Sequence, residues 1–287
     1  MNKKSNIQEL CLNSKGYPEL LATIAAPPKK LYLRGSIKEL PLIAVVGTRK
    51  PTEYGRKLCY RICYDLASSG IGIVSGLAYG IDAIAHQAAL DAHGFTIAVL
   101  GNAIDSIYPA GNQHLAGNII ESGGAIVSEY EPGTNTQRFN FPARNRIIAG
   151  LSLGVLIPEA DAKSGSLITA NFAVQENRMV MAVPGSVFNL RSAGPNNLLK
   201  SGAKPVTDAT DVLAEFELRN PALTRKAPKP ASATEARIIE LVEDGTNTTE
   251  ELLRQLELTS PELAQTLSLM EITGKLRSLG AGQWVAR

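Results

Sequence analysis

Short runs of apolar residues alternate with longer amphipathic stretches through the first 216 positions of the chain. The apolar runs are rich in Val and Ile and predict strands, and the stretches between them predict helices. Strands that are apolar throughout and separated by helices are typical of a parallel sheet covered on both faces. We therefore expect an α/β fold with an extended Rossmann-like, doubly wound and mostly parallel sheet. The predicted strands are 43–46, 72–75, 96–100, 125–128, 154–157 and 179–183, and the predicted helices are 52–69, 80–93, 113–121, 166–177 and 208–216.

The pattern changes after residue 217. A segment rich in Pro, Ala and basic residues (220–233, NPALTRKAPKPASA) predicts a linker. Beyond it, three short amphipathic stretches predict helices and a Gly-centred stretch predicts a hairpin, which together form the winged-helix pattern. These helices are 234–244, 249–257 and 261–273, and the hairpin is 275–286. The predicted organisation is an N-terminal extension (1–40), a Rossmann-like domain (41–217), a linker (218–233) and a small C-terminal winged-helix domain (234–287).

Length and composition exclude several classes of protein. With 287 residues, of which 44% are hydrophobic and 20% charged, the chain can bury a sizeable core and is not a disordered protein. Three cysteines cannot form a disulfide framework, and no apolar run approaches the roughly 18 residues of a membrane span. The N-terminus also lacks the apolar region of a signal peptide. We expect a cytoplasmic protein that does not contact the membrane.

Charge is unevenly distributed along the chain. The formal net charge is +2, but no Lys or Arg occurs between Arg61 and Arg138, so the cations gather around 49–61, 138–146 and 200–204. Such clusters are compatible with a polyanion site, although clustering alone slightly favours ordinary solvated surface charge. Residues 232–287 hold five basic and nine acidic side chains, a net charge of −4. The predicted winged helix is therefore poorly suited to tight duplex binding, and a protein-contact or auxiliary role is favoured.

Several predicted strands lead into Gly-containing turns just before a helix, where free backbone N–H groups and the helix dipole suit a phosphate. One such turn is Gly47, Thr48 and Arg49, followed by Lys50, and its spacing matches neither the dinucleotide fingerprint nor the P-loop. Similar turns lie in SGLAYGID (75–82) and in EADAKSGSLITA (159–170). The segments 101–112 and 184–204 are further candidate loops, the second containing Lys200.

The segment 138–149 (RFNFPARNRIIA) is the most informative candidate loop. It places three arginines beside two phenylalanines in a chain with only 5% aromatic residues. Guanidinium groups beside aromatic rings suit single-stranded nucleic acid, because the cations meet phosphates and the rings stack on unpaired bases. A buried Phe pair with exposed arginines fits the same residues. The residues in question are Arg138, Phe139, Phe141, Arg144 and Arg146.

Signs of catalysis or of a bound cofactor are missing from the sequence. No Cys or His spacing resembles a metal site, and no nucleophile elbow is present. Cys59 and Cys63 are spaced for core packing on one helix, and nothing marks Glu129 and Glu159 as an acid/base pair. We expect binding without catalysis, with no metal and no cofactor.

Taken together, these motifs resemble the DNA-processing protein A (DprA/Smf) family over nearly all of residues 17–216. The similar stretches are YPELLATIAAPPKKLYLRG (17–35), VVGTRKPTEYG (45–55), IVSGLAYGIDAIAHQAAL (73–90), TIAVLGNAIDSIYPAGN (96–112), GGAIVSEYEPGT (123–134), FNFPARNRIIAGLS (139–152), SGSLITA (164–170) and AVPGSVFN (182–189). The C-terminal winged helix is also found in many members of that family.

The resemblance implies a single-stranded DNA-binding recombination mediator, commonly a homodimer, that protects single strands and loads the RecA recombinase, notably in natural transformation. The chain departs from some relatives in having little before the Rossmann region, so we expect their N-terminal helical module to be absent or vestigial. It also has Lys163, an additional positive charge that we expect to extend the DNA-binding groove. The expected single-strand site is Gly47, Thr48, Arg49, Lys50, Gly76, Arg138, Phe139, Phe141, Arg144, Asn145, Arg146, Lys163, Ser164, Gly165, Ser166 and Lys200.

Two alternatives use the same cleft differently. Nucleotide phosphoribohydrolases similar to the lysine decarboxylase-like proteins share this Rossmann variant and have a PGGxGTxxE motif with a catalytic Glu. The corresponding segment here is SGSLITANF, with no carboxylate at the matching offset. The other alternative is a sensor of a free nucleotide, which would bind a mononucleotide tightly and oligonucleotides not at all.

Overall fold

The computed structural model describes residues 7–216, 232–244, 246, 248–256, 258–273, 275–280 and 282–286. The chain divides into two compact units, Met1–Arg219 and Asn220–Arg287. Most of the predicted linker (218–233) and the first six residues of the predicted N-terminal extension lie outside the described residues. Each unit is described by itself.

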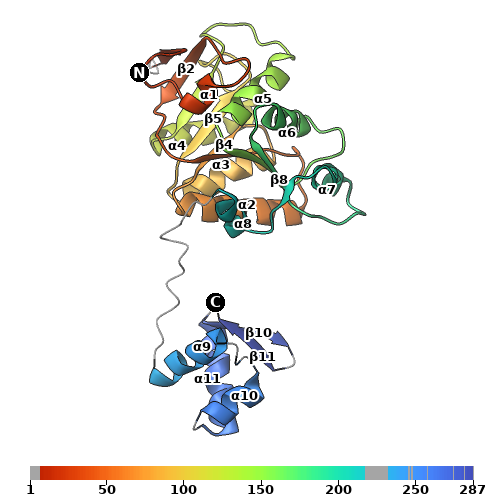
Figure 1. The fold of residues 1–287 in the computed structure, drawn as a ribbon. Helices are drawn as coiled ribbons and strands as arrows, with labels where there is room; N and C mark the ends of the chain where they lie inside the picture. The colour runs from red at the N-terminus through yellow and green to blue at the C-terminus, as the bar shows by residue number, and fades with distance from the viewer. Residues whose placement is uncertain are drawn as a thin grey trace. The chain divides into compact units, whose positions relative to one another are not determined.

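The described part of the first unit is built on a mixed nine-stranded sheet (Figure 1). Its strands are β1 Gln8–Cys11, β2 Lys30–Gly35, β3 Leu42–Val45, β4 Gly72–Ser75, β5 Thr96–Leu100, β6 Ala125–Ser128, β7 Gly154–Ile157, β8 Met179–Ala182 and β9 Lys204–Pro205. They lie in the order β1-β2-β6-β5-β4-β3-β7-β8-β9. The strands from β6 to β9 in this order are parallel, and β1 and β2 extend the β6 edge in antiparallel pairing. The predicted α/β class with a mostly parallel sheet is confirmed.

Strand order reverses at β3. From β3 the chain passes through β4, β5 and β6 on one side, and then returns to place β7, β8 and β9 on the other. The carboxyl ends of β3 and β7 therefore lie next to each other at a topological switch point, where ligands of open α/β sheets collect.

Helices cover both faces of the sheet, so the central strands are buried on both sides. α1, α5 and α6 contribute to one large apolar core, and α4 contributes to a separate cluster. Such two-sided burial explains why the strands are apolar throughout. The helices are α1 Glu19–Ala22, α2 Glu53–Ser68, α3 Ile81–Asp91, α4 Gln113–Glu121, α5 Asn140–Gly150, α6 Ser166–Gln175, α7 Ala193–Lys200 and α8 Ala209–Glu215, with 3-10 turns η1 Ala110–Asn112 and η2 Leu190–Ser192.

Two of the expected loops are in fact partly helical. The segment 138–149 mostly forms α5, and 184–204 contains η2 and α7. Pro142 does not break α5, because it occupies the first turn, where a backbone N–H has no partner within the helix. Three strands were not predicted from the sequence: the two edge strands β1 and β9, and β2, which lies between β1 and β6.

The described part of the second unit has three helices, α9 Ala233–Glu243, α10 Thr249–Gln255 and α11 Ser260–Ile272, followed by an antiparallel pair, β10 Leu276–Gly280 and β11 Gln283–Ala286. It has its own apolar core, which includes Ile238, Leu252 and Leu267. Lys275 Nζ lies 2.5 Å from Glu235 Oε2 in a largely buried ion pair. The element order is the predicted winged-helix order, with boundaries displaced by at most two residues. Among the described residues, no helix is long and apolar enough to cross a bilayer.

Candidate functional site

A cleft of about 670 Å³ opens at the carboxyl ends of β3 and β7, on the switch point of the sheet. The loop after β3, the start of α5 and the start of α6 form its walls. Its exposed cations include Arg49, Lys50 and Arg138. Arg191, which precedes α7, also lines it. This position follows from the topology, because consecutive parallel strands all end at the same edge.

The loop after β3 is held by backbone contacts. Thr48 N–H donates to the Glu159 carbonyl over 2.7 Å, and Lys50 N–H donates to Thr48 Oγ1 over 3.3 Å. A Cβ at position 47 would lie 2.6 Å from that same carbonyl, so only glycine fits there. Thr48 is therefore buried as an anchor, and Arg49 and Lys50 are presented to solvent.

The Glu159 side chain connects this loop to the N-terminus of α2. Its buried carboxylate accepts hydrogen bonds from Thr52 N–H over 2.8 Å and from Thr52 Oγ1 over 2.5 Å, at the N-terminus of α2. A carboxylate in this position stabilises the helix end and orders the loop above it. Glu159 therefore has a structural role.

Arg144 on α5 is buried beneath the cleft, and its hydrogen bonds are to the protein itself. Nη1 donates to the Gly76 carbonyl over 2.8 Å and also to the Val99 carbonyl, which joins α5 to the ends of β4 and β5. Burial lowers the pKa of Arg144 to about 10, and the nearby Asp82 carboxylate opposes this decrease. Arg144 is therefore still charged at neutral pH.

Asp82 is the buried counter-charge of Arg144. Burial raises the pKa of the Asp82 carboxyl, while the Arg144 charge and backbone N–H donors, including Gly76 N–H at 3.1 Å, oppose the increase. Gly76 lies directly against the guanidinium, since a Cβ there would be 2.7 Å from both Nη1 and Nη2. Gly76 is thus required by the close approach of Arg144.

Asn145 connects this buried pair to the turn before α6. Its Oδ1 accepts from Arg144 Nε over 3.2 Å, and its Nδ2 donates to the Gly165 carbonyl over 3.3 Å. In that turn the hydroxyls of Ser164 and Ser166 lie 2.8 Å apart at the start of α6. The positive end of α6 and two hydroxyls thus face the cleft, a favourable environment for an anion.

An aromatic hollow of about 60 Å³ adjoins the cleft. The rings of Phe141 and Tyr108 lie 5.2 Å apart at 51°, and Tyr79 lines the same hollow with both tyrosines partly exposed. Tyr79 and Tyr108 were not predicted from the sequence as site residues, although both lie in the candidate loops 75–82 and 101–112. Arg191 was not predicted either; it lies in η2, just before α7, and lines the cleft.

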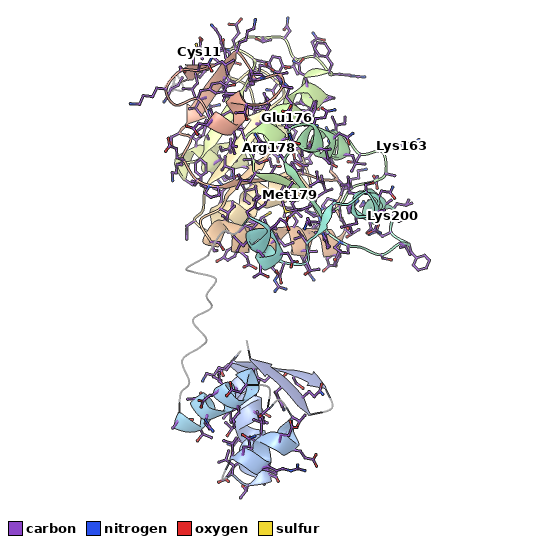
Figure 2. All side chains as sticks on the ribbon, in the orientation of Figure 1. Cys11, Lys163, Glu176, Arg178, Met179 and Lys200 are labelled. Atoms are coloured by element: carbon purple, nitrogen blue, oxygen red, sulfur yellow. The ribbon has the colours of Figure 1, made fainter. Side chains whose placement is uncertain are left out.

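The structure brings together most, but not all, of the expected site residues. Phe139 and Lys163 are exposed and do not line the cleft, and Arg146 is paired with Glu129 Oε1 over 2.5 Å. Lys200 lines a separate hollow of about 390 Å³ beside α7. Figure 2 labels Lys163 and Lys200. The expected residues that line the cleft or the adjoining aromatic hollow are Gly47, Thr48, Arg49, Lys50, Gly76, Arg138, Phe141, Arg144, Asn145, Ser164, Gly165 and Ser166.

The described residues contain no metal-binding cluster, and two of the three cysteines are buried, whereas Cys11 is exposed on β1. No cluster of three His, Cys, Asp or Glu side chains is placed to hold a metal among the described residues. His86 is buried with Nδ1 2.7 Å from Thr96 Oγ1. Cys59 and Cys63 are buried on α2, and their contact, together with burial, raises the pKa of the Cys59 thiol.

Residues 8–217 match the family model of the DNA recombination-mediator protein A, and residues 222–282 match that of the DprA winged helix domain. This chain belongs to the DNA recombination-mediator protein A family. It is 43% identical to protein Smf of Escherichia coli (strain K12) over 207 residues, which are 71% of this chain and 55% of that protein. It is 40% identical to the DNA processing protein DprA of Bacillus subtilis (strain 168) over 221 residues, 76% of this chain and 74% of that one. The chain thus spans about half the length of the E. coli relative.

Two solved structures of this family are similar to this chain. The crystal structure of DprA from Streptococcus pneumoniae matches with a TM-score of 0.69 at 42% identity, covering 75% of this chain and 76% of that one. The structure of DNA processing protein A from Helicobacter pylori, which addresses the single-stranded DNA binding mode of that protein, matches with a TM-score of 0.67 at 33% identity. It covers 76% of this chain and 98% of that one.

Proposed function

We propose that this family member binds single-stranded DNA in the cleft at the switch point of its sheet. The main support is the arrangement of charge: Arg49, Lys50 and Arg138 line one cleft together with the positive end of α6. Exposed cations and a helix N-terminus are what a run of phosphates requires, without any need to recognise base sequence. The H. pylori relative, whose structure addresses single-stranded DNA binding, supports the same assignment.

The preference for a single strand comes from the aromatic hollow. Phe141, Tyr108 and Tyr79 surround a space beside the cations. A base can stack there only when it has left its neighbours, which costs little in a single strand and much in a duplex. Aromatic stacking together with phosphate contacts gives affinity that is strong, salt-dependent and tolerant of sequence.

Arg144 has a different role from the exposed arginines. Since its guanidinium is buried and bonded to backbone carbonyls, it positions the loops that bind DNA and holds them together. Asn145 extends this effect to the turn before α6. Arg49 and Arg138 are better placed to meet phosphates, because they line the cleft and are exposed.

The protein acts without catalytic turnover in this proposal. Among the described residues, two acidic ones line the cleft: Asp82 is held by the Gly76 N–H and the Arg144 charge, and Asp161 is exposed. A hydrolase of the same Rossmann variant would need a catalytic Glu in the segment that corresponds to 164–172, and this segment, SGSLITANF, has no carboxylate. The proposed biological role is that of a cytoplasmic mediator, acting as a homodimer that protects single strands and loads RecA.

Fluorescence anisotropy with labelled DNA of about 30 nucleotides tests the proposal. The full-length protein should bind the single strand at least about tenfold more tightly than the matching duplex, because only unpaired bases reach the aromatic hollow. A mononucleotide competitor distinguishes the sensor alternative. Equal affinity for both DNA forms, or tight binding of the mononucleotide alone, would contradict the proposal.

A further inference from the structure

The loop between β8 and α7 exposes three large apolar side chains. Val187, Phe188 and Leu190 are 83%, 96% and 81% exposed. In Figure 1 this loop extends away from the sheet between β8 and α7. Exposed apolar residues gathered on one loop are unusual in a soluble domain and mark an interaction site.

The loop is fixed at both ends. At its start, Gly185 N–H donates to Asn196 Oδ1 over 3.2 Å, and Asn196 Nδ2 donates back to the Gly185 carbonyl over 3.0 Å. At its end, Ala160 N–H donates to the Arg191 carbonyl over 2.8 Å, directly after β7. The apolar side chains are therefore presented from a tethered loop.

The hydrogen bond between Ala160 and Arg191 also brings the end of the loop to the cleft. Arg191 lines the cleft wall, one residue after Leu190 and three after Phe188. On the other side, Gly185 and Val187 line the hollow that contains Lys200. A strand leaving the cleft past Arg191 would cross the apolar tip before it meets Lys200.

The charge of this region favours a polyanion as the occupant. Residues 177–207 contain Arg178, Arg191, Lys200 and Lys204 but no Asp or Glu. Lys204 is paired with Glu215 and Arg178 donates to the Leu20 carbonyl, whereas Arg191 and Lys200 line the cleft and the adjoining hollow. An unpaired nucleotide fits such a region, because its phosphate can meet the cations and its base can pack on the exposed apolar side chains.

We propose that the loop 185–191 is a second subsite for single-stranded DNA, where Phe188 stacks on a base that has passed beyond the cleft. This inference rests on the proposed function, and it places Lys200 beside the outgoing strand. A short strand should then occupy only the cleft, and a longer strand should occupy both the cleft and the loop.

Substitution of Phe188 combined with a change of DNA length tests the subsite. The full-length Phe188→Ala protein should bind an oligonucleotide of about 24 thymidines at least about fivefold more weakly than wild type, because a stacked base is lost. Its affinity for one of about 4 thymidines should be unchanged. Val174→Ala, which truncates an exposed apolar side chain on α6 (65% exposed), is the matched control and should bind both lengths normally.

A spectroscopic variant reports the contact directly. Trp284 is the single tryptophan of the chain, so Phe188→Trp in a Trp284→Phe background places the only indole on the loop. Stacking on a base should quench its emission when the longer oligonucleotide is added, and the tryptophan should restore affinity for the longer strand. Emission unchanged at saturation would overturn the subsite.

The remaining outcomes separate the subsite from the cleft and from self-association. If wild type binds the longer strand and Phe188→Ala binds it equally well, the subsite is wrong and the cleft proposal stands. If Phe188→Ala instead lowers the mass measured by light scattering, and its affinity loss is the same at both lengths, the loop contacts a second copy and the subsite is also wrong. Failure of wild type to bind either strand would overturn both proposals.

Discussion

Arg144 illustrates how much of this site depends on a single buried side chain. Its charge is countered by Asp82, and its hydrogen bonds join the ends of β4 and β5 to α5. Removing one partner of a buried charge pair leaves the other uncompensated, which costs more than the pair itself contributes. The sequence identified Arg144 as important from its neighbours. Its burial could not be foreseen, because that depends on three elements far apart in the chain.

Gly76→Ala tests the close packing around Arg144. The added methyl group would lie 2.7 Å from the guanidinium, and relieving that clash should lower the free energy of unfolding by about 1–3 kcal/mol. Urea unfolding of the full-length variant measures the change.

The control for this substitution is Gly117→Ala on α4, where a Cβ meets no atom within 4 Å. Replacement of glycine by alanine inside a helix should be neutral or stabilising there. Equal stability of Gly76→Ala and wild type would show that the Arg144 guanidinium can move aside. Close packing would then not explain why position 76 is a glycine.

At the scale of elements, the sequence predicted best those strands whose pattern is determined by burial alone. β4, β5, β6 and β7 have the predicted bounds, because strands buried on both faces are apolar throughout. α5 was missed because it is buried on one side and contributes Phe141, Arg144 and Asn145 to the site on the other, so it lacks a clear apolar stripe. The edge strands were missed because only two of the four residues of β1 are apolar and β9 has two residues.

The same distinction applies to the site. The turn at Gly47 and the turn before α6 follow strands that the sequence predicts, so their convergence on one edge could be expected. Tyr79, Tyr108 and Arg191 reach the site through irregular segments, whose paths are set by packing. Lys200 lies in the hollow beside α7, a helix that the sequence did not reveal.

At the scale of the whole molecule, the two units differ in charge and in the features they contain. The cleft, the aromatic hollow and the exposed loop all belong to the first unit. The second unit has a net charge of −1, because residues 232–287 are −4 and residues 220–231 are +3. Each unit has its own apolar core. The acidic winged-helix part of the second unit is therefore not expected to add much to the binding of a polyanion.

Removal of residues 218–287 tests this division of roles. The truncated protein should bind single-stranded DNA within about threefold of the full-length affinity, since the phosphate contacts lie in the first unit. Anisotropy at one fixed salt concentration is sufficient, with thermal unfolding to show that the first unit remains folded. A loss above about tenfold would show that the basic linker or the acidic winged helix takes part in binding.

The dependence of affinity on salt, measured for wild type and Arg49→Ala, tests most directly whether the cleft holds the phosphates. Each lost phosphate contact should reduce the slope of log K against log salt by about 0.7 on a single strand. Lys57→Ala is the matched control, because Lys57 is an exposed cation on α2 paired with Glu53 and does not line the cleft. We predict a shallower slope for Arg49→Ala and an unchanged slope for Lys57→Ala. Parallel slopes for Arg49→Ala and wild type would contradict the assignment of the cleft as the DNA site.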